Sequence, residues 1–507
     1  MFGFDPTTTT FLIYIIGMIL IGLIAYRVTN NLSDYILGGR RLGSFVTALS
    51  AGASDMSGWL LMGLPGAVYA GGLIEGWLAI GLTLGAYFNW KLVAGRLRSQ
   101  TEYSGDALTL PEYFHNRFAD KTRVIKILSA AIFLLFFAIY CASGVVAGAR
   151  VFENLFGVPY QYAVWYGAIA TILYTFIGGF LAVSWTDTIQ ASLMVFALIL
   201  TPLFVVINLG GIEAMQQTIA QAQQLANHDY NNMFAGTTFL GILSLLAWGL
   251  GYFGQPHIVV RFMAAESVKS LENARRISMT WMVICLTGAI GIGYFGMAYF
   301  FAYPEQATVV NQNKEQIFIE LAKILFNPWI TGILLSAILA AVMSTLSAQL
   351  LICSSAITED LYKGIIRPTA TDKELIWLGR VMVLAVAALA IYIAQDPNSQ
   401  VFALVKDAWA GFGSAFGPVL LFSLFWKRMN GFGAISGMLT GALIVYLWKY
   451  ISPVVNLTEM YSIIPGFIAA SFAIWLVSLI TPPPSQAVVD TFERADNAFQ
   501  QQINGTR

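Results

Sequence analysis

The sequence predicts an all-α integral membrane protein of thirteen transmembrane helices, with an inverted five-helix repeat as its core. Three observations lead to this prediction: the composition is apolar, thirteen apolar runs of about twenty residues recur, and two of the runs are interrupted by small residues. Of the 507 residues, 57% are hydrophobic and 11% charged, and the mean hydropathy is +0.70. Soluble proteins carry about 25% charged residues, so this composition excludes a soluble globular domain.

Each predicted span is long enough to cross the ~30 Å hydrocarbon core of a bilayer. The first ten residues contain no Lys or Arg, so the first span is expected to be retained and not cleaved as a signal peptide. The chain after Thr481 is expected to be a short, polar, solvated tail. The predicted spans are residues 8–27, 44–66, 72–94, 126–149, 160–180, 187–209, 236–256, 276–301, 328–353, 375–395, 400–425, 430–452 and 460–481.

The distribution of basic residues predicts the orientation. With the N-terminus outside, 20 of the 27 Lys and Arg residues fall in inward-facing segments and 4 in outward-facing ones. The positive-inside rule therefore places the N-terminus outside and the C-terminus inside.

The composition indicates neither a nucleic-acid partner nor a metal site. The net charge of the chain is zero, which indicates no nucleic-acid partner, and the scattered Cys and His residues predict no disulfide, zinc or haem site.

A single transporter domain is predicted, because no linker separates a second folded unit. Spans 2 and 7 are five spans apart, an odd number, so spans 2–6 and 7–11 have opposite orientations in the bilayer. The predicted parts are 1–43 (first span and inner loop), 44–209 (first repeat), 236–425 (second repeat), 430–481 (two extra spans) and 482–507 (cytoplasmic tail).

The interruptions in spans 2 and 7 indicate a binding site at the membrane midplane. Span 2 is broken by Gly and Ser residues around Asp55, and span 7 by glycines before Pro256. Broken helices in corresponding halves are typical of secondary transporters, whose freed backbone groups line a cavity. Asp55 is expected to belong to a cation or substrate site, since carboxylates inside membranes are functional by default. The alternative is a structural carboxylate that caps the second half-helix.

Span 9 offers the partner for this break. Ala341, Ser344 and Thr345 lie at i, i+3 and i+4 and so share one helix face, at a depth comparable to that of Asp55. Hydroxyl and carbonyl oxygens suit a hard monovalent cation, although Ser and Thr also bond back to their own helix.

Aromatic side chains lie at mid-span, away from the interfaces where Trp and Tyr concentrate. These rings could wall a small amphipathic solute, and for Tyr140 core packing is the alternative. They are Trp59, Tyr140, Trp248 and Tyr252.

Other features favour simpler interpretations. Glu75 and Asp187 lie near predicted span ends and could be interfacial, Lys406–Asp407 could pair locally or snorkel, and Arg380 could form part of an inner gate. Two GxGxxG matches, beginning at Gly249 and Gly291, lie in apolar spans without a preceding strand, so a nucleotide fingerprint is excluded. The glycines at 433, 437 and 441 predict a face for close helix packing.

Three long stretches resemble the sodium/solute symporter family: residues 43–67, 174–187 and 336–363. The likeness covers almost the whole chain and weakens in the loops 210–235 and 302–327 and in the tail. It implies a bacterial cytoplasmic-membrane protein that transports Na⁺ together with L-proline and needs no organic cofactor. The resemblance implies a sodium site of Ala53, Met56, Ala341, Ser344 and Thr345, the first three through backbone carbonyls. It implies a proline site of Asp55, Ser57, Gly58, Trp59, Tyr140, Trp248, Tyr252 and Pro256, and Arg40 at the inner mouth of span 2 also matches the family pattern. The candidate gating residues are Arg40, Asp187 and Arg380.

The favoured hypothesis is therefore Na⁺-coupled uptake of L-proline by alternating access. Another small amino acid or a carboxylate is the nearest alternative. Proton coupling through Asp55 is a second, but it leaves Ser344 and Thr345 without a role. A membrane receptor would require a signalling domain, and only about 25 polar residues follow the last span. No nucleophile, base and orienting group occur together to support an enzyme.

Overall fold

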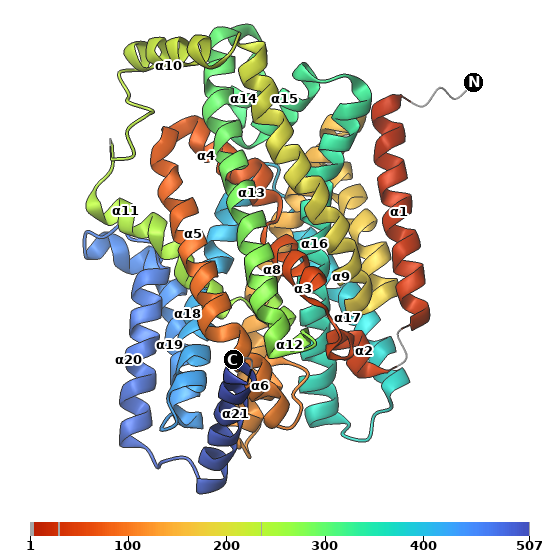
Figure 1. Cartoon of the computed structure of the whole chain (residues 1–507), viewed down its shortest axis with the longest axis vertical. Coiled ribbons are helices and arrows are strands. Elements are labelled where there is room, and N and C mark those ends of the chain that lie inside the picture. Colours follow the sequence, from red (N-terminus) through yellow and green to blue (C-terminus); the bar gives the residue numbers. More distant parts are fainter. Residues whose placement is uncertain (1–4, 29–30, 235, 506–507) are drawn as a thin grey trace.

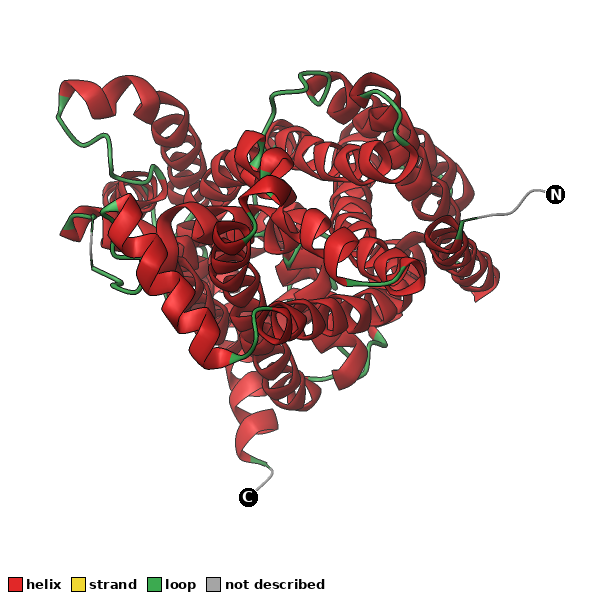
Figure 2. Ribbon diagram, turned by 90° about the horizontal axis from the view of Figure 1, so that it is seen from above, coloured by secondary structure: helices red, strands yellow, loops and turns green. Residues whose placement is uncertain are grey.

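The computed structural model describes residues 5–28, 31–234 and 236–505, and the regular elements among them are helices (Figures 1 and 2). Ten of the described helical runs are long and apolar enough to cross a membrane. The α-helices are α1 Pro6–Val28, α2 Leu32–Leu37, α3 Ser44–Asp55, α4 Leu64–Gly71, α5 Gly76–Phe88, α6 Gly95–Tyr103, α7 Leu110–Arg117, α8 Val124–Phe156, α9 Tyr160–Asn208, α10 Ile212–Ala226, α11 Phe239–Leu246, α12 Pro256–Ala264, α13 Val268–Ala302, α14 Thr308–Gln312, α15 Ile317–Leu325, α16 Pro328–Ser355, α17 Asp372–Ile393, α18 Val401–Phe425, α19 Gly431–Val454, α20 Ile463–Ile480 and α21 Gln486–Asn504. Shorter 3₁₀ or π segments are η1 Gly38–Arg40, η2 Trp59–Gly63, η3 Gly72–Glu75, η4 Asn89–Ala94, η5 Ala247–Gly254, η6 Pro304–Gln306, η7 Lys314–Gln316 and η8 Ala356–Ile366.

Helices occupy the predicted spans, and several of them extend beyond the predicted ends. Two of these differences affect the site. α9 continues through residues 181–186, which were expected to be a loop, and its break lies instead at Gly179 (φ 61°, ψ −158°). This positive φ favours glycine, which has no Cβ to clash. The second half of span 7 extends through α12 to Ala264, beyond the predicted end at residue 256. Hydropathy missed this half-helix because it carries polar residues that are buried only by long-range partners.

Burial separates central helices from peripheral ones. The apolar part of α16 is 89% buried and that of α18 is 83% buried, whereas the values for α1, α19 and α20 are 28%. α16 and α18 therefore lie inside the bundle, and α1, α19 and α20 lie on its outside, as Figure 1 shows for α1 and α20 at opposite edges. The outer helices present large apolar side chains to their surroundings, as expected for surfaces that face lipid.

Glycines allow the close helix contacts around span 7. A Cβ at Gly249 would meet the backbone of Gly81 in α5, one at Gly251 the indole of Trp409, and one at Gly254 the backbone of α18. The first GxGxxG match therefore serves helix packing. The predicted small-residue face of span 12 is confirmed: a Cβ at Gly433, Gly437 or Gly441 would collide with α20 or α18.

The chain after Thr481 is not a solvated tail, as was expected, because it forms the helix α21 against α6. Phe492 and Phe499 are buried on the packed face of α21. Ser99 Oγ donates to the Ala495 carbonyl at 2.7 Å, and Arg96 of α6 pairs with Asp496. Composition marked this segment as polar, but its apolar residues recur on one face and pack on a neighbour far away in sequence. α21 and α10 lie at opposite ends of the molecule (Figure 1).

Candidate functional site

The break in span 2 frees a backbone carbonyl next to span 9. α3 ends at Asp55, and Met56 leaves helical geometry with φ −82° and ψ 80°. The Ser57 amide donates to the Asp55 carbonyl at 3.0 Å, so it does not serve the Ala53 carbonyl as a continuing helix would. The C-terminal end of the half-helix also carries partial negative charge, which favours a cation there.

Two hydroxyls of α16 meet this freed carbonyl. Ser344 Oγ lies 2.7 Å from the Ala53 oxygen and 3.0 Å from the Ala341 oxygen, and Thr345 Oγ1 lies 3.4 Å from the Ala53 oxygen. All four residues are buried, and so is Met56. Four of the five predicted sodium ligands therefore form one cluster of oxygen atoms, at the predicted meeting of spans 2 and 9. Its donor set suits a hard cation such as Na⁺.

The Asp55 side chain contacts span 7. Tyr252 donates its hydroxyl hydrogen to Asp55 Oδ2 at 2.5 Å, and Trp59 Nε1 donates to the Asp55 carbonyl at 3.2 Å. The described hydrogen bonds include none from a backbone N–H to the Asp55 side chain, whereas Ser57 Oγ accepts from the Trp59 amide at 3.5 Å. This geometry favours Asp55 as part of a binding site over Asp55 as a helix cap, because a capping side chain would accept a hydrogen bond from a backbone N–H of the following half-helix.

Asn89 is a neighbour of Asp55 that the sequence analysis missed. Asp55, Asn89, Tyr252 and Ser278 line one small cavity of about 10 Å³, enough for roughly one water molecule. Within the described chain, Asp55 Oδ1 and both amide atoms of Asn89 are buried without a hydrogen-bond partner. Buried polar groups are normally paired, so this cavity is a polar site. An Asn inside an apolar span was the signal that could have found it.

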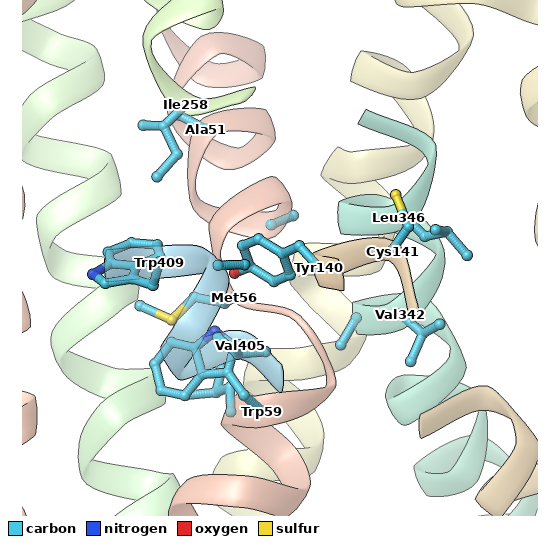
Figure 3. Packing of buried hydrophobic residues seen from close by; sticks show 14 of the residues in the cluster. Ala51, Met56, Trp59, Tyr140, Cys141, Ile258, Val342, Leu346, Val405 and Trp409 are labelled. Atoms are coloured by element: carbon cyan, nitrogen blue, oxygen red, sulfur yellow. The ribbon is translucent and has the colours of Figure 1, made fainter. Parts of the chain in front are cut away.

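The predicted aromatic residues are buried around the two breaks. Figure 3 shows Trp59, Tyr140 and Trp409 around Met56 at the end of α3. Tyr252 contacts Trp409 edge-on, with ring centroids 5.1 Å apart and an interplanar angle of 86°. The Tyr140 hydroxyl has no hydrogen-bond partner in the described part of the chain, so it offers a polar group to the break region.

Trp248 belongs to an aromatic stack that sequence analysis did not anticipate. It stacks on Phe402 with centroids 5.2 Å apart and on Trp409 at 6.4 Å, and Trp409 Nε1 donates to the Trp248 carbonyl at 2.8 Å. α18 supplies both partner rings, and the amides of its first residues, Val401 and Phe402, donate to the Glu315 carboxylate.

Pro256 is the first residue of α12, a position where the missing N–H of proline removes no hydrogen bond of the helix. Ser57 and Gly58 lie in the break itself, and a Cβ on Gly58 would meet Ala147 at 2.7 Å.

Asp187 is fully buried, so the expectation of an interfacial position was wrong. The helix begins before residue 187 and carries it about two turns into the bundle, where Ser50 Oγ donates to Asp187 Oδ2 at 2.7 Å. Arg261 of α12 lies 3.4 Å from the same oxygen and donates to Ser50 Oγ at 3.1 Å and to the His257 carbonyl at 2.6 Å. Ser50, Asp187 and Arg261, named here the buried latch, join spans 2, 6 and 7.

Arg40 forms a second connection below the latch. Its guanidinium donates to the carbonyls of Met263 at 2.8 Å and Ala107 at 2.9 Å, and pairs with Asp106 at 2.9 Å. Beside it, the Leu42 amide donates to the Ala264 carbonyl at 3.2 Å and the Leu42 carbonyl accepts from the Glu266 amide at 3.0 Å. Two of the three predicted gating residues thus hold the same ends of spans 2 and 7 together. The third, Arg380, lies instead over the Tyr26 ring of α1 at 5.1 Å.

Three other charged residues of the predicted spans, Lys406, Asp407 and Glu75, are in no described ion pair. Lys406 lies over the Tyr461 ring at 5.5 Å, and Asp407 is in no described ion pair within 4 Å. Glu75 is the last residue of the short segment η3, directly before the first residue of α5.

A multi-pass helical bundle, in which one broken helix borders an oxygen cluster and contacts a second broken helix, is the arrangement of a membrane transporter and not of an enzyme. A sequence profile described as the sodium:solute symporter family matches residues 35–441, and the chain belongs to this family. Members of this family couple solute transport to Na⁺, so Na⁺ is the coupling ion. A sodium/proline symporter of Haemophilus influenzae is 67% identical, over 99% of this chain and 100% of that protein. A sodium/proline symporter of Escherichia coli is 63% identical over 97% and 96% of the two chains.

A solved structure shares the fold at low sequence identity. A substrate-bound, outward-open Na⁺-coupled sialic acid symporter superposes with a TM-score of 0.80 at 19% identity, covering 96% of this chain and 100% of that one. At this identity the likeness concerns the fold alone.

Proposed function

We propose that this protein carries L-proline into the cell together with Na⁺, by alternating access. The observation that carries the proposal is the meeting of the Ser344 and Thr345 hydroxyls with the freed Ala53 carbonyl. The names of the relatives, which are sodium/proline symporters at 67% and 63% identity, support proline as the solute.

The proposed ion site consists of the carbonyls of Ala53, Met56 and Ala341 and the hydroxyls of Ser344 and Thr345. In the structure the hydroxyls approach the carbonyls as hydrogen-bond donors. A bound Na⁺ takes the lone pairs of both kinds of oxygen, so each hydroxyl turns its hydrogen elsewhere. The ion then bridges the end of α3 to α16 and fixes the geometry of the break.

The proposed proline site lies on the other side of this break. The carboxylate of proline suits the N-terminus of the half-helix α12, where N–H groups carry partial positive charge. The secondary ammonium suits the Asp55 carboxylate, which has no described cationic partner, and the ring suits aromatic walls. The proposed residues are Asp55, Ser57, Gly58, Trp59, Tyr140, Trp248, Tyr252 and Pro256.

Coupling follows because Met56 connects the two sites. An ion that orders residues 53–56 also places Asp55 and the residues after it for proline. By linkage, proline must then raise the affinity for Na⁺ by the same factor.

The topology that fits this mechanism has thirteen spans, of which spans 2–6 and 7–11 form an inverted repeat. We place the protein in the bacterial cytoplasmic membrane, with the N-terminus outside and the C-terminal helix α21 inside. The buried latch and Arg40 then close the cytoplasmic end, and their separation would admit solute to the cytoplasm. Arg40 and Asp187 are the proposed gating residues. Arg380 is proposed to assist the gate from the periphery of the bundle, through its contact with the Tyr26 ring of α1.

The test is uptake of radiolabelled L-proline into proteoliposomes that contain the purified protein. We expect accumulation with an inward Na⁺ gradient, and none with an equal K⁺ gradient or with a proton gradient alone. Ser344→Ala should require more Na⁺ for half-maximal uptake. The matched control is Ser336→Ala, since Ser336 is buried in α16 and, among the described hydrogen bonds, donates back to the Gly332 carbonyl of its own helix at 2.8 Å. Uptake driven equally by protons would refute sodium coupling, and stronger competition by another amino acid would refute proline as the solute.

A further inference from the structure

A cationic pocket opens at the α21 end of the bundle, outside the transport site. Its volume is about 360 Å³, and its walls come from η4, the first turns of α13 and the end of α21. Lys91, Lys269 and Arg275 supply three positive charges to it, while Phe499 and Ile503 supply an apolar side. The pocket therefore combines concentrated positive charge with an apolar wall.

Within the described chain, these three cations have no carboxylate partner. Among the described ion pairs none includes Lys91, Lys269 or Arg275. Glu272, the carboxylate on the pocket wall, pairs with Arg276 at 2.8 Å. Lys91 and Arg275 approach one exposed ring, that of Tyr87, at 5.7 and 5.8 Å. Two helices thus bring unpaired charges to one place, where an anion would be attracted.

A separate apolar furrow lies further along α5 and α13, on the side of the pocket away from α21. It lies between α5 and α13, has a volume of about 390 Å³, and is lined by side chains that include Ile80, Leu84 and Val283. These residues are exposed, as are Tyr87 and Phe88 between the furrow and the pocket. Lys91 and Ile80 are eleven residues apart, so a helix separates them by about 16 Å, close to the ~15 Å depth of one leaflet's hydrocarbon.

We propose that an anionic phospholipid binds here, with its headgroup in the cationic pocket and an acyl chain in the apolar furrow. The occupant is a phospholipid with net negative charge, such as phosphatidylglycerol, of the leaflet at the α21 end. Charge complementarity selects the headgroup, and basic pockets between transmembrane helices at this side of a membrane hold such headgroups. A soluble anion would leave the apolar furrow without a role.

The binding site has a structural consequence for the transporter. α5 contacts the broken span 7 through Gly81 and Gly249, and α13 packs on α3. The lipid therefore ties together two helices that each touch one broken span, and it also contacts α21. We expect the bound lipid to stabilise the whole bundle.

The experiment uses the full-length protein, purified in detergent and titrated with phosphatidylglycerol or with zwitterionic phosphatidylethanolamine. Native mass spectrometry counts retained lipid, and a thermal melt measures stabilisation. Phosphatidylglycerol should be retained and should raise the melting temperature, whereas phosphatidylethanolamine should do neither. Lys91→Gln/Arg275→Gln should weaken phosphatidylglycerol binding by about thirtyfold, given the usual contribution of each cation near a membrane surface.

The matched control is Lys121→Gln/Lys373→Gln, which removes the same charge from exposed residues elsewhere at this end of the molecule. It should bind phosphatidylglycerol like the parent. Arg275→Lys keeps the charge and should also retain the lipid, which covers the case in which the double variant fails to fold. Equal losses in the double variant and its control would overturn the proposal, as would equal retention of the two lipids. Stabilisation by inorganic phosphate alone would show a site for a free anion and refute the lipid.

Discussion

The buried latch gives the sharpest prediction, through the substitution Asp187→Asn. Asp187 and Arg261 are both almost completely excluded from solvent, so the substitution leaves a buried guanidinium without its counter-charge. Breaking a buried pair in this way typically costs about 3–5 kcal/mol. We expect about 3 kcal/mol, the lower end of that range, because Arg261 keeps its bonds to Ser50 and to the His257 carbonyl.

The size of this loss should appear as a change in conformational equilibrium. The latch exists when spans 2, 6 and 7 are closed at the α21 end, so about 3 kcal/mol lost from this state shifts the ratio of closed to open forms about 150-fold. The assay is the rate at which a membrane-impermeant maleimide, applied from the α21 side, labels a cysteine at position 47. Thr47 is fully buried in the first turn of α3, and the native Cys141, Cys285 and Cys353 are buried, which limits background labelling.

A double variant separates a latch from a merely structural pair. Asp187→Asn with Arg261→Gln removes both charges, so most of the lost thermal stability should return. The latch is still absent, however, so labelling should stay faster than in the parent. If labelling in Asp187→Asn matches the parent, or if the double variant restores both stability and slow labelling, the latch interpretation is wrong.

Three further predictions concern the transport site. Thr345→Ala should raise the Na⁺ concentration for half-maximal uptake while changing proline affinity at saturating Na⁺ less, and unchanged Na⁺ dependence would remove Thr345 from the ion site. Trp248→Ala should weaken proline binding, measured with radiolabelled proline, by about ten- to a hundredfold, because a buried aromatic contact contributes about 1–3 kcal/mol. If the variant only lowers the amount of protein, Trp248 is a packing residue and not part of the proline site. Asp55→Asn should abolish Na⁺-driven uptake although the variant reaches the membrane in normal amount, whereas Asp55→Glu should retain partial transport at raised Na⁺ concentration. Normal transport by Asp55→Asn would instead favour the helix-cap role, because a cap needs an acceptor oxygen but no charge.

The sequence was sufficient to predict most of the helical architecture, because apolar runs and helix breakers are local signals. The break after Asp55 and the shared face of Ser344 and Thr345 could be located from residue type and helical spacing. The contact between Ser344 and the end of α3, 291 residues apart in sequence, could be predicted because both positions lie at a similar depth when residues are counted from the ends of their spans.

What could not be predicted depends on partners distant in sequence. Arg261 lies beyond the predicted end of span 7 and so was expected in a loop, because its burial depends on partners distant in sequence, such as the Asp187 carboxylate 74 residues earlier. Asn89 was passed over because its significance comes from the cavity it shares with Asp55. The helix α21 was expected to be solvated because its charged face dominates its composition, whereas its packing depends on α6.

The contact between α6 and α21 has a consequence for biosynthesis. Ser99 and Ala495 are separated by 396 residues, so the ribosome needs about 20–80 s to supply the partner after α6 has been made. During this interval the face of α6 that will receive Phe492 and Phe499 lacks its cover. A chain cut before residue 486 can never cover it. Covering of this surface thus distinguishes chains that have reached α21 from shorter ones, because until then the Ser99 and Gln100 side chains of α6 lack the carbonyl partners that α21 supplies.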